Sequence, residues 1–75
     1  MDVRELPFYV LASLYYYGSA TLNDLVNRKG LKSNSREDIL NALEQNKRDG
    51  YAEVDSSDTW SITKSGIIRL SVERD

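Results

Sequence analysis

The sequence predicts a small α+β domain that is mainly helical, and three observations support this fold class. Its 75 residues suffice for one domain only, so we treat residues 1–75 as a single unit. Apolar residues recur with helical spacing over most of the chain, and the pattern changes to strand-like alternation after residue 50. Each of the four glycines stands where a predicted element ends: Gly18, Gly30, Gly50 and Gly66.

Composition excludes several functional classes. The chain has no cysteine and no histidine, so it cannot form disulfides or the usual Cys/His zinc sites, and we expect no metal. It also lacks a Gly-rich phosphate loop and a nucleophile elbow, which argues against an enzyme. No apolar run approaches the roughly 20 residues that span a membrane, and the charged N-terminal sequence lacks the apolar segment of a signal peptide. We therefore expect a cytoplasmic protein with no cofactor and no membrane partner.

A first helix is predicted over about residues 5–17. Pro7 suits its first turn, where the missing N–H has no partner to lose. Gly18 is expected to end the helix in the left-handed C′ position, and residues 19–21 leave room only for a short bridging strand. The apolar stripe of this helix repeats at spacings of four, four and three residues, through Leu6, Val10, Leu14 and Tyr17.

Two further helices follow, each preceded by a capping residue. Thr21 and Asp24 resemble a capping box that starts a short second helix, which stops by Gly30. Ser35 is expected to cap a third helix over about residues 35–49, with acids in the first turn and cations in the last. Helical spacing predicts that the buried face of this third helix carries Ile39, Ala42 and Leu43.

A β-hairpin is predicted after the third helix. Residues 51–55 and 59–63 alternate polar and apolar side chains, and residues 56–58 have turn chemistry. Thr63 then suits the cap of a last helix over about residues 64–73. The apolar face of the hairpin is expected to carry Ala52, Val54, Trp60 and Ile62.

The order helix, short strand, helix, turn, helix, hairpin, helix is that of the winged helix-turn-helix. Residues 43–54 resemble its third helix running into the first wing strand, and residues 60–66 resemble the Leu/Ile-Thr-x-x-Gly corner after the wing. Over nearly its whole length the chain resembles small bacterial and archaeal winged-helix transcription regulators, including PadR-like and related archaeal proteins. The resemblance implies three helices, a two-stranded β wing and a short C-terminal helix, in a protein that binds DNA and regulates transcription.

Asn46 departs from this family pattern, which usually places a large apolar residue four positions before the glycine that ends the third helix. Helical phase puts Asn46 beside Leu43 on the buried side. A buried amide must find hydrogen-bond partners or cost a few kcal/mol. We therefore expect that Asn46 caps a backbone group, or that the third helix is rotated or packs against a partner.

The third helix is the expected recognition helix, because the second helix of a DNA-reading helix-turn-helix enters the major groove. Its polar side chains match the hydrogen-bonding edges of adenine and guanine, although polar residues also occupy any exposed helix face. We predict that bases are read by Asn34, Arg36, Asn41 and Gln45.

Phosphate contacts are predicted around the turn that leads into the third helix. Residues 28–36 carry a local charge of +4 in a chain of net charge −2, which leaves −6 for the remainder. Such a cluster could hold the DNA backbone, or it could be a solvated loop. The candidate phosphate contacts are Arg28, Lys29, Lys32, Ser33, Ser35 and Lys64.

The predicted wing has the opposite charge. Residues 51–60 contain three acids and no cation, whereas a wing that lies in a minor groove normally brings Arg or Lys. We therefore expect that the wing tip does not touch DNA strongly, or that it binds a basic partner.

Aromatic residues crowd the first helix, more than a thin core can bury. Tyrosine and phenylalanine are enriched at interface cores, although a tyrosine can also lie half-buried with its hydroxyl in water. With apolar residues of the last helix they predict a homodimer surface formed by Phe8, Tyr9, Tyr15, Tyr16, Ile68 and Val72.

Double-stranded DNA and a second copy of the chain are thus the predicted partners. Because winged helices also serve as interaction modules, the alternative is a protein–protein module that binds no DNA. A third option is an accessory subunit of a larger nucleic-acid machine.

Overall fold

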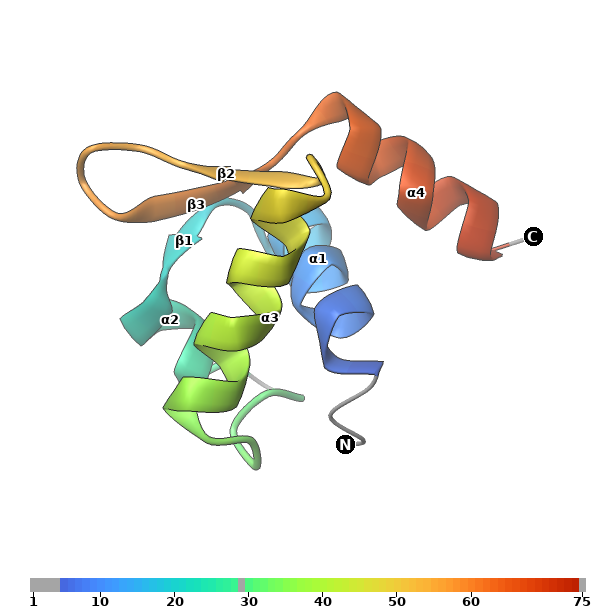
Figure 1. The fold of residues 1–75 in the computed structure, drawn as a ribbon. Helices are drawn as coiled ribbons and strands as arrows, with labels where there is room; N and C mark the ends of the chain where they lie inside the picture. The colour runs from blue at the N-terminus through green and yellow to red at the C-terminus, as the bar shows by residue number, and fades with distance from the viewer. Residues whose placement is uncertain (1–4, 29, 75) are drawn as a thin grey trace.

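The computed structural model describes residues 5–28 and 30–74. Within them, four helices and a three-stranded antiparallel sheet follow one another in the predicted order, which confirms the mainly helical α+β class (Figure 1). The elements are α1 (Leu6–Tyr17), β1 (Ala20–Thr21), α2 (Leu22–Val26), α3 (Arg36–Arg48), β2 (Ala52–Val54), β3 (Thr59–Ile62) and α4 (Lys64–Arg74).

The predicted caps begin three of the helices. The Thr21 hydroxyl accepts a hydrogen bond from the Asp24 amide, and the Asp24 carboxylate accepts one from the Thr21 amide, which is a complete capping box. Ser35 Oγ accepts from the Asp38 amide at the start of α3. Thr63 Oγ1 accepts from the Gly66 amide at the start of α4. These local bonds satisfy backbone donors that a helix start leaves unpaired.

The sheet has the order β1-β3-β2, so the two-residue β1 pairs with β3 rather than with its sequence neighbour. In the predicted hairpin, Val54 lies opposite Trp60 and Ala52 opposite Ile62, as the alternation indicated. On the other edge Ala20 lies opposite Trp60. Figure 1 shows the hairpin and α4 extending in opposite directions above α3.

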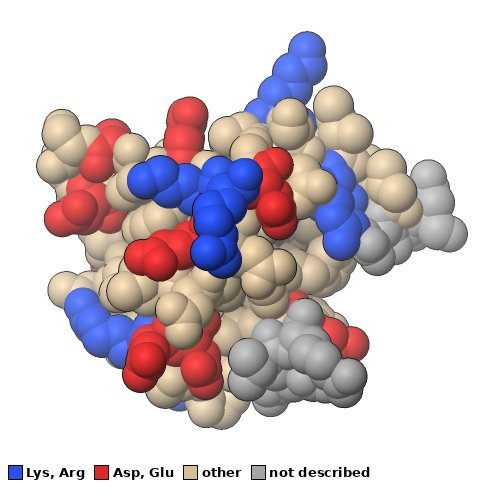
Figure 2. All heavy atoms as spheres, viewed as in Figure 1, with Lys and Arg blue, Asp and Glu red and all other residues tan. Residues whose placement is uncertain are grey.

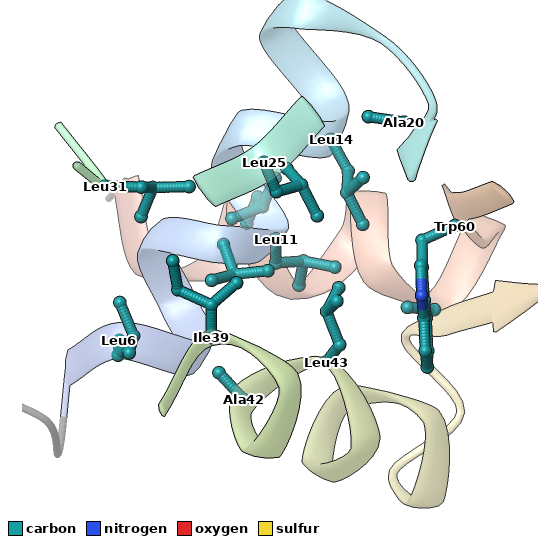
Figure 3. Packing of buried hydrophobic residues seen from close by; sticks show 13 residues of the cluster. Leu6, Leu11, Leu14, Ala20, Leu25, Leu31, Ile39, Ala42, Leu43 and Trp60 are labelled. Carbon is teal, nitrogen blue, oxygen red and sulfur yellow. The ribbon is translucent and has the colours of Figure 1, made fainter. Parts of the chain in front are cut away.

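The core lies between α1, α2 and α3 (Figure 3). Leu11 of α1, Leu25 of α2 and Leu43 of α3 point toward one another there, and each is almost completely buried. Ile39 and Ala42 are also buried, so the predicted inner face of α3 is confirmed. Burial of leucine-sized side chains stabilises a fold by about 1.5–3 kcal/mol each, so this helix contact contributes several kcal/mol.

Asn46 is buried, as helical phase predicted, and it caps a backbone group. Its Nδ2 donates to the Pro7 carbonyl oxygen at 3.0 Å, and the residue is only 3% exposed. The first of the expected explanations is therefore confirmed, and α3 needs no rotation to accommodate the amide. The bond ties the last turns of α3 to the first turn of α1.

The corner between β3 and α4 explains why a glycine stands at position 66. A Cβ built on Gly66 would collide with the Tyr51 carbonyl oxygen and would lie 2.7 Å from Ile62 Cγ1. Thr63 holds the same corner, because its hydroxyl donates to the Gly50 carbonyl at 2.6 Å. The Thr-x-x-Gly sequence is thus a local packing requirement of this turn.

Two details differ from the predictions. Gly18 has a positive φ of 92°, but its ψ of 172° is extended, so it does not adopt the left-handed helical C′ conformation. The chain leaves α1 directly into the short strand β1, which requires extended backbone. Gly66 lies in the first turn of α4 and not, as predicted, at the end of an element.

Candidate nucleic-acid interface

The outer face of α3 is a row of polar side chains in water. Glu37, Asn41, Glu44 and Arg48 follow one another at helical spacings of four, three and four residues, and all four are exposed. The row lies opposite the buried face of the helix. It therefore presents hydrogen-bonding groups along three turns of α3 with no apolar side chain between them.

A broad groove borders one edge of this row. It has a volume of about 890 Å³ and lies between the start of α2, the exposed edge of α3 and the β2–β3 hairpin. Arg36, Lys47 and Arg48 bring cations to its wall, whereas Glu44 and Asp58 bring acids. Its apolar floor comes from Leu22, Leu40, Val54 and Trp60.

Charges of both signs are mixed over this side of the molecule. Figure 2 shows Lys and Arg side chains interspersed with Asp and Glu side chains across the face that carries α3. The groove is therefore not a uniformly basic surface. Among the described residues that line it, the three cations lie on α3, and one of the two acids, Asp58, comes from the hairpin.

The predicted base readers lie at different places around α3. Arg36 lines the groove beside the hairpin. Asn41 and Gln45 are exposed and line a separate depression that Pro7 of α1 borders. Asn34 precedes the helix and is half-buried, and its Oδ1 is covered and has no hydrogen-bond partner among the described residues. Its amide oxygen is thus turned away from solvent, which leaves Arg36, Asn41 and Gln45 as the accessible candidates.

The predicted phosphate contacts are also distributed unevenly. Lys32 and Ser33 are exposed in the turn before α3, and Ser35 Oγ is engaged by the helix cap. Lys64 is exposed at the start of α4 and does not line the groove. Lys29 lies outside the described residues.

Arg28 serves the fold rather than an outer surface. Its Nη1 donates to the Ser13 carbonyl, to Ser13 Oγ and to the Gly18 carbonyl, each at 3.1 Å. Its guanidinium also lies 5.9 Å from the centre of the Tyr17 ring. Arg28 thus ties the C-terminal end of α1 to the chain that follows α2, and we leave it out of the interface.

Lys47 was not among the predicted contacts, although the sequence contains a signal for it. Eleven residues separate it from Arg36, and eleven residues return to nearly the same side of a helix after three turns. The two cations therefore share one edge of α3. A cation in the last turn of a helix also favours the helix dipole, which by itself explains a lysine at this position.

Part of the acidity of the hairpin is structural. Asp55 Oδ1 accepts hydrogen bonds from the Ser57 amide at 2.8 Å and from the Thr59 amide at 3.0 Å. Asp58 has a positive φ of 61°, a conformation in which Asp and Asn are enriched. These two acids are therefore typical of the tight turn that joins β2 to β3.

The predicted dimer residues lie on α1 and α4, two helices that contact each other. Tyr9, Tyr15 and Tyr16 are exposed on α1, and Phe8 is half-buried against the core. The other two, Ile68 and Val72, are exposed on α4, where they border a shallow depression with Tyr51, Ser65 and Arg69.

No protein-family model, curated protein or solved structure matches this chain. Among the described residues, no helix has the length and apolarity to cross a membrane, and no group of acidic side chains is arranged to hold a metal ion. Functional inference therefore rests on the geometry of the surfaces described above.

Proposed function

We propose that this chain is a winged helix-turn-helix protein that binds double-stranded DNA and regulates transcription. In this proposal α2 and α3 form the helix-turn-helix, β2 and β3 form the wing, and α3 enters the major groove. The observation that carries the proposal is the pairing of an exposed polar row on α3 with cations along one edge of the same helix. Base contacts and backbone contacts both require such an arrangement.

Base reading would come from the exposed amides and the guanidinium groups of α3. Asn41 and Gln45 can each bind an adenine edge through two hydrogen bonds, and Arg36 or Arg48 can bind guanine in the same way. All four side chains are exposed. We therefore expect sequence preference to depend most on Asn41, which lies in the outermost row of the helix.

Backbone contacts would come from the two ends of α3. Lys32 and Ser33 precede the helix, and Arg36 stands in its first turn, where unpaired amides also favour an anion. Lys47 lines the same groove as Arg36 at the other end of the helix. A duplex that follows this edge would meet cations at both ends of α3, whereas Asp58 of the hairpin lines the same groove and would oppose a phosphate there.

The proposal is tested by fluorescence anisotropy with mixed-sequence DNA duplexes. Because each neutralised phosphate releases counterions, affinity should fall by orders of magnitude between about 50 and about 200 mM salt. The double variant Arg36→Ala/Lys47→Ala should bind more weakly and with a smaller salt slope, by about one unit of log K per log salt for each lost contact. Lys64→Ala removes one cation outside the groove and is the charge-matched control for the single variants Arg36→Ala and Lys47→Ala, with little change expected.

Two results would contradict the proposal. Unchanged binding in the double variant would place any DNA contact elsewhere on the molecule. Absence of binding by the unaltered chain at about 50 mM salt, where nonspecific binding is strongest, would instead favour a protein–protein interaction module.

A further inference from the structure

Helix α1 has a composition that does not match its position at the surface. None of its residues from Leu6 to Tyr17 is charged. Tyr9 and Tyr15 are nevertheless 43% exposed and Tyr16 is 57% exposed. A helix that is apolar all round is normally covered on all sides. The described part of the chain covers only one side of α1.

The exposed side of α1 is symmetric about Ala12. Aromatic residues stand three and four positions before it, as Tyr9 and Phe8, and three and four positions after it, as Tyr15 and Tyr16. Residues three and four apart lie on the same face of a helix, so these four rings surround a small residue. The four residues that lie one and two positions from Ala12 along the chain are all buried: Val10, Leu11, Ser13 and Leu14.

The rings are paired in the same way on both sides of Ala12. Phe8 and Tyr9 form an edge-to-face pair with ring centres 5.6 Å apart, and Tyr15 and Tyr16 form another with centres 5.0 Å apart. Each pair is a preorganised apolar ridge, and Ala12 leaves a low point between the two ridges. Helices pack closely when the ridges of one fit the grooves of the other.

We infer that α1 is the contact surface of a symmetric homodimer, in which two α1 helices pair antiparallel across a twofold axis at Ala12. Such an axis places the C-terminal half of α1 in one copy beside the N-terminal half of α1 in the other. Phe8 and Tyr15 are seven positions apart and share one side of Ala12, and Tyr9 and Tyr16 share the other side in the same way. Tyr15 then meets Phe8 of the second copy, and Tyr16 meets Tyr9. An isologous contact joins the same patch of both copies, so the patch must be complementary to itself, and in this arrangement every ring meets a ring.

The size of the surface sets the expected strength of the dimer. Aromatic side chains bury about 150–250 Å² each when fully covered, so these half-exposed rings can contribute only a few hundred Å². A standard interface buries about 800 Å² per partner, and we therefore expect a dissociation constant on the order of micromolar. No charge on α1 opposes the contact.

Ile68 and Val72 take no part in this contact. They border a depression with Tyr51 that contains no α1 residue. The groove beside α3 also contains no α1 residue. The dimer inference therefore does not depend on DNA binding, and each can fail without the other.

Cysteine cross-linking tests the position of the axis, because the natural chain has no cysteine. In the proposed dimer, Ala12→Cys places two thiols side by side on the axis, within the Cα separation that a disulfide allows. Under mild oxidation it should form covalent dimers at least about tenfold faster than Ser71→Cys, because the contact raises the effective thiol concentration. Ser71 is exposed on α4 and serves as the control. Equal cross-linking rates of the two variants would overturn the inference.

Sedimentation equilibrium of the unaltered chain, without DNA, gives the second test. We expect a dimer to dominate at about 100 µM protein, since the expected dissociation constant is on the order of micromolar. Ala12→Glu should weaken it on the order of a hundredfold by placing two carboxylates at the axis, whereas Val72→Glu should not. Circular dichroism checks that each variant is folded. If Ala12→Glu does not fold, the cross-linking experiment decides the inference by itself. A monomeric mass for the unaltered chain at about 100 µM would overturn the inference.

Discussion

Helices α1 and α3 have nearly the same length, 12 and 13 residues, and pack against each other, yet their outer faces differ completely. α3 buries Ile39 and Leu43 and presents charged and amide side chains to water. α1 buries Leu11 and Leu14 equally well but presents tyrosines. The comparison shows that a shared core does not determine what an outer face does. One helix is suited to a polar ligand, and the other to an apolar partner.

The shared core should give the largest effect when it is broken. Leu43 is completely buried between the two helices. We expect Leu43→Ala to lower the free energy of unfolding by about 2–5 kcal/mol, because it removes packed atoms and leaves a cavity. Urea denaturation followed by circular dichroism measures this loss. A loss below about 1 kcal/mol would contradict the described packing of α1 on α3.

The Arg28 contact should give the next largest effect, because it holds only the C-terminal end of α1. Arg28→Met keeps an apolar stem but removes three hydrogen bonds that the guanidinium donates to Ser13 and Gly18. We expect a loss of about 2 kcal/mol, since the donor is charged. Lys32→Met removes the same charge from an exposed site and should change stability by less than about 0.5 kcal/mol. Equal losses of stability in the two variants would show that the lost net charge, and not the Arg28 contact, determines the effect.

The bond from Asn46 to Pro7 should give a smaller effect. Asn46→Leu supplies the apolar side chain usual in the resembled family but removes a 3.0 Å hydrogen bond to α1. We expect a loss of about 1 kcal/mol and a lower melting temperature. A raised melting temperature in a thermal scan would mean that burial of the amide costs more free energy than its hydrogen bond contributes.

These contacts mark the limit of what the sequence could predict. Periodicity and capping residues are local, so the helix positions, the Thr21 capping box and the buried phase of Asn46 all followed from short stretches of sequence. The partner of Asn46 lies 39 positions away, and those of Arg28 lie 15 and 10 positions away. Only the folded chain brings such groups together, and no local pattern indicates them.

The candidate site shows the same limit. The sequence predicted that Asn41 and Gln45 would be exposed, because helical phase places both outside the buried face of the third helix. It could not show that the hairpin brings Asp58 to the groove that Arg36 lines, or that Arg28 is used by the fold. Asn34 illustrates the difference most simply, because its residue type suits adenine but the fold turns its amide oxygen inward.

The smallest effect concerns the outer face of α3 alone. Glu44 is exposed on the wall of the groove, so Glu44→Gln should change stability by less than about 0.5 kcal/mol. If DNA follows this edge, removal of the acid should raise nonspecific affinity severalfold at low salt, since like charges across an interface oppose binding. Glu53→Gln in β2, outside the groove, is the control for net charge. Anisotropy titrations that show the same gain in both variants would argue against a DNA path along this groove.

The central claim is that α1 and α3 serve separate partners, and sedimentation velocity with a fluorescent duplex at about 50 mM salt tests it most directly. Arg36→Ala/Lys47→Ala should lose most of the duplex-bound signal and remain dimeric. Ala12→Glu should become monomeric. It should bind the duplex more weakly, because one copy of the chain contacts the DNA in place of two. A duplex-bound signal unchanged by Arg36→Ala/Lys47→Ala, together with a monomeric mass for the unaltered chain, would contradict the account.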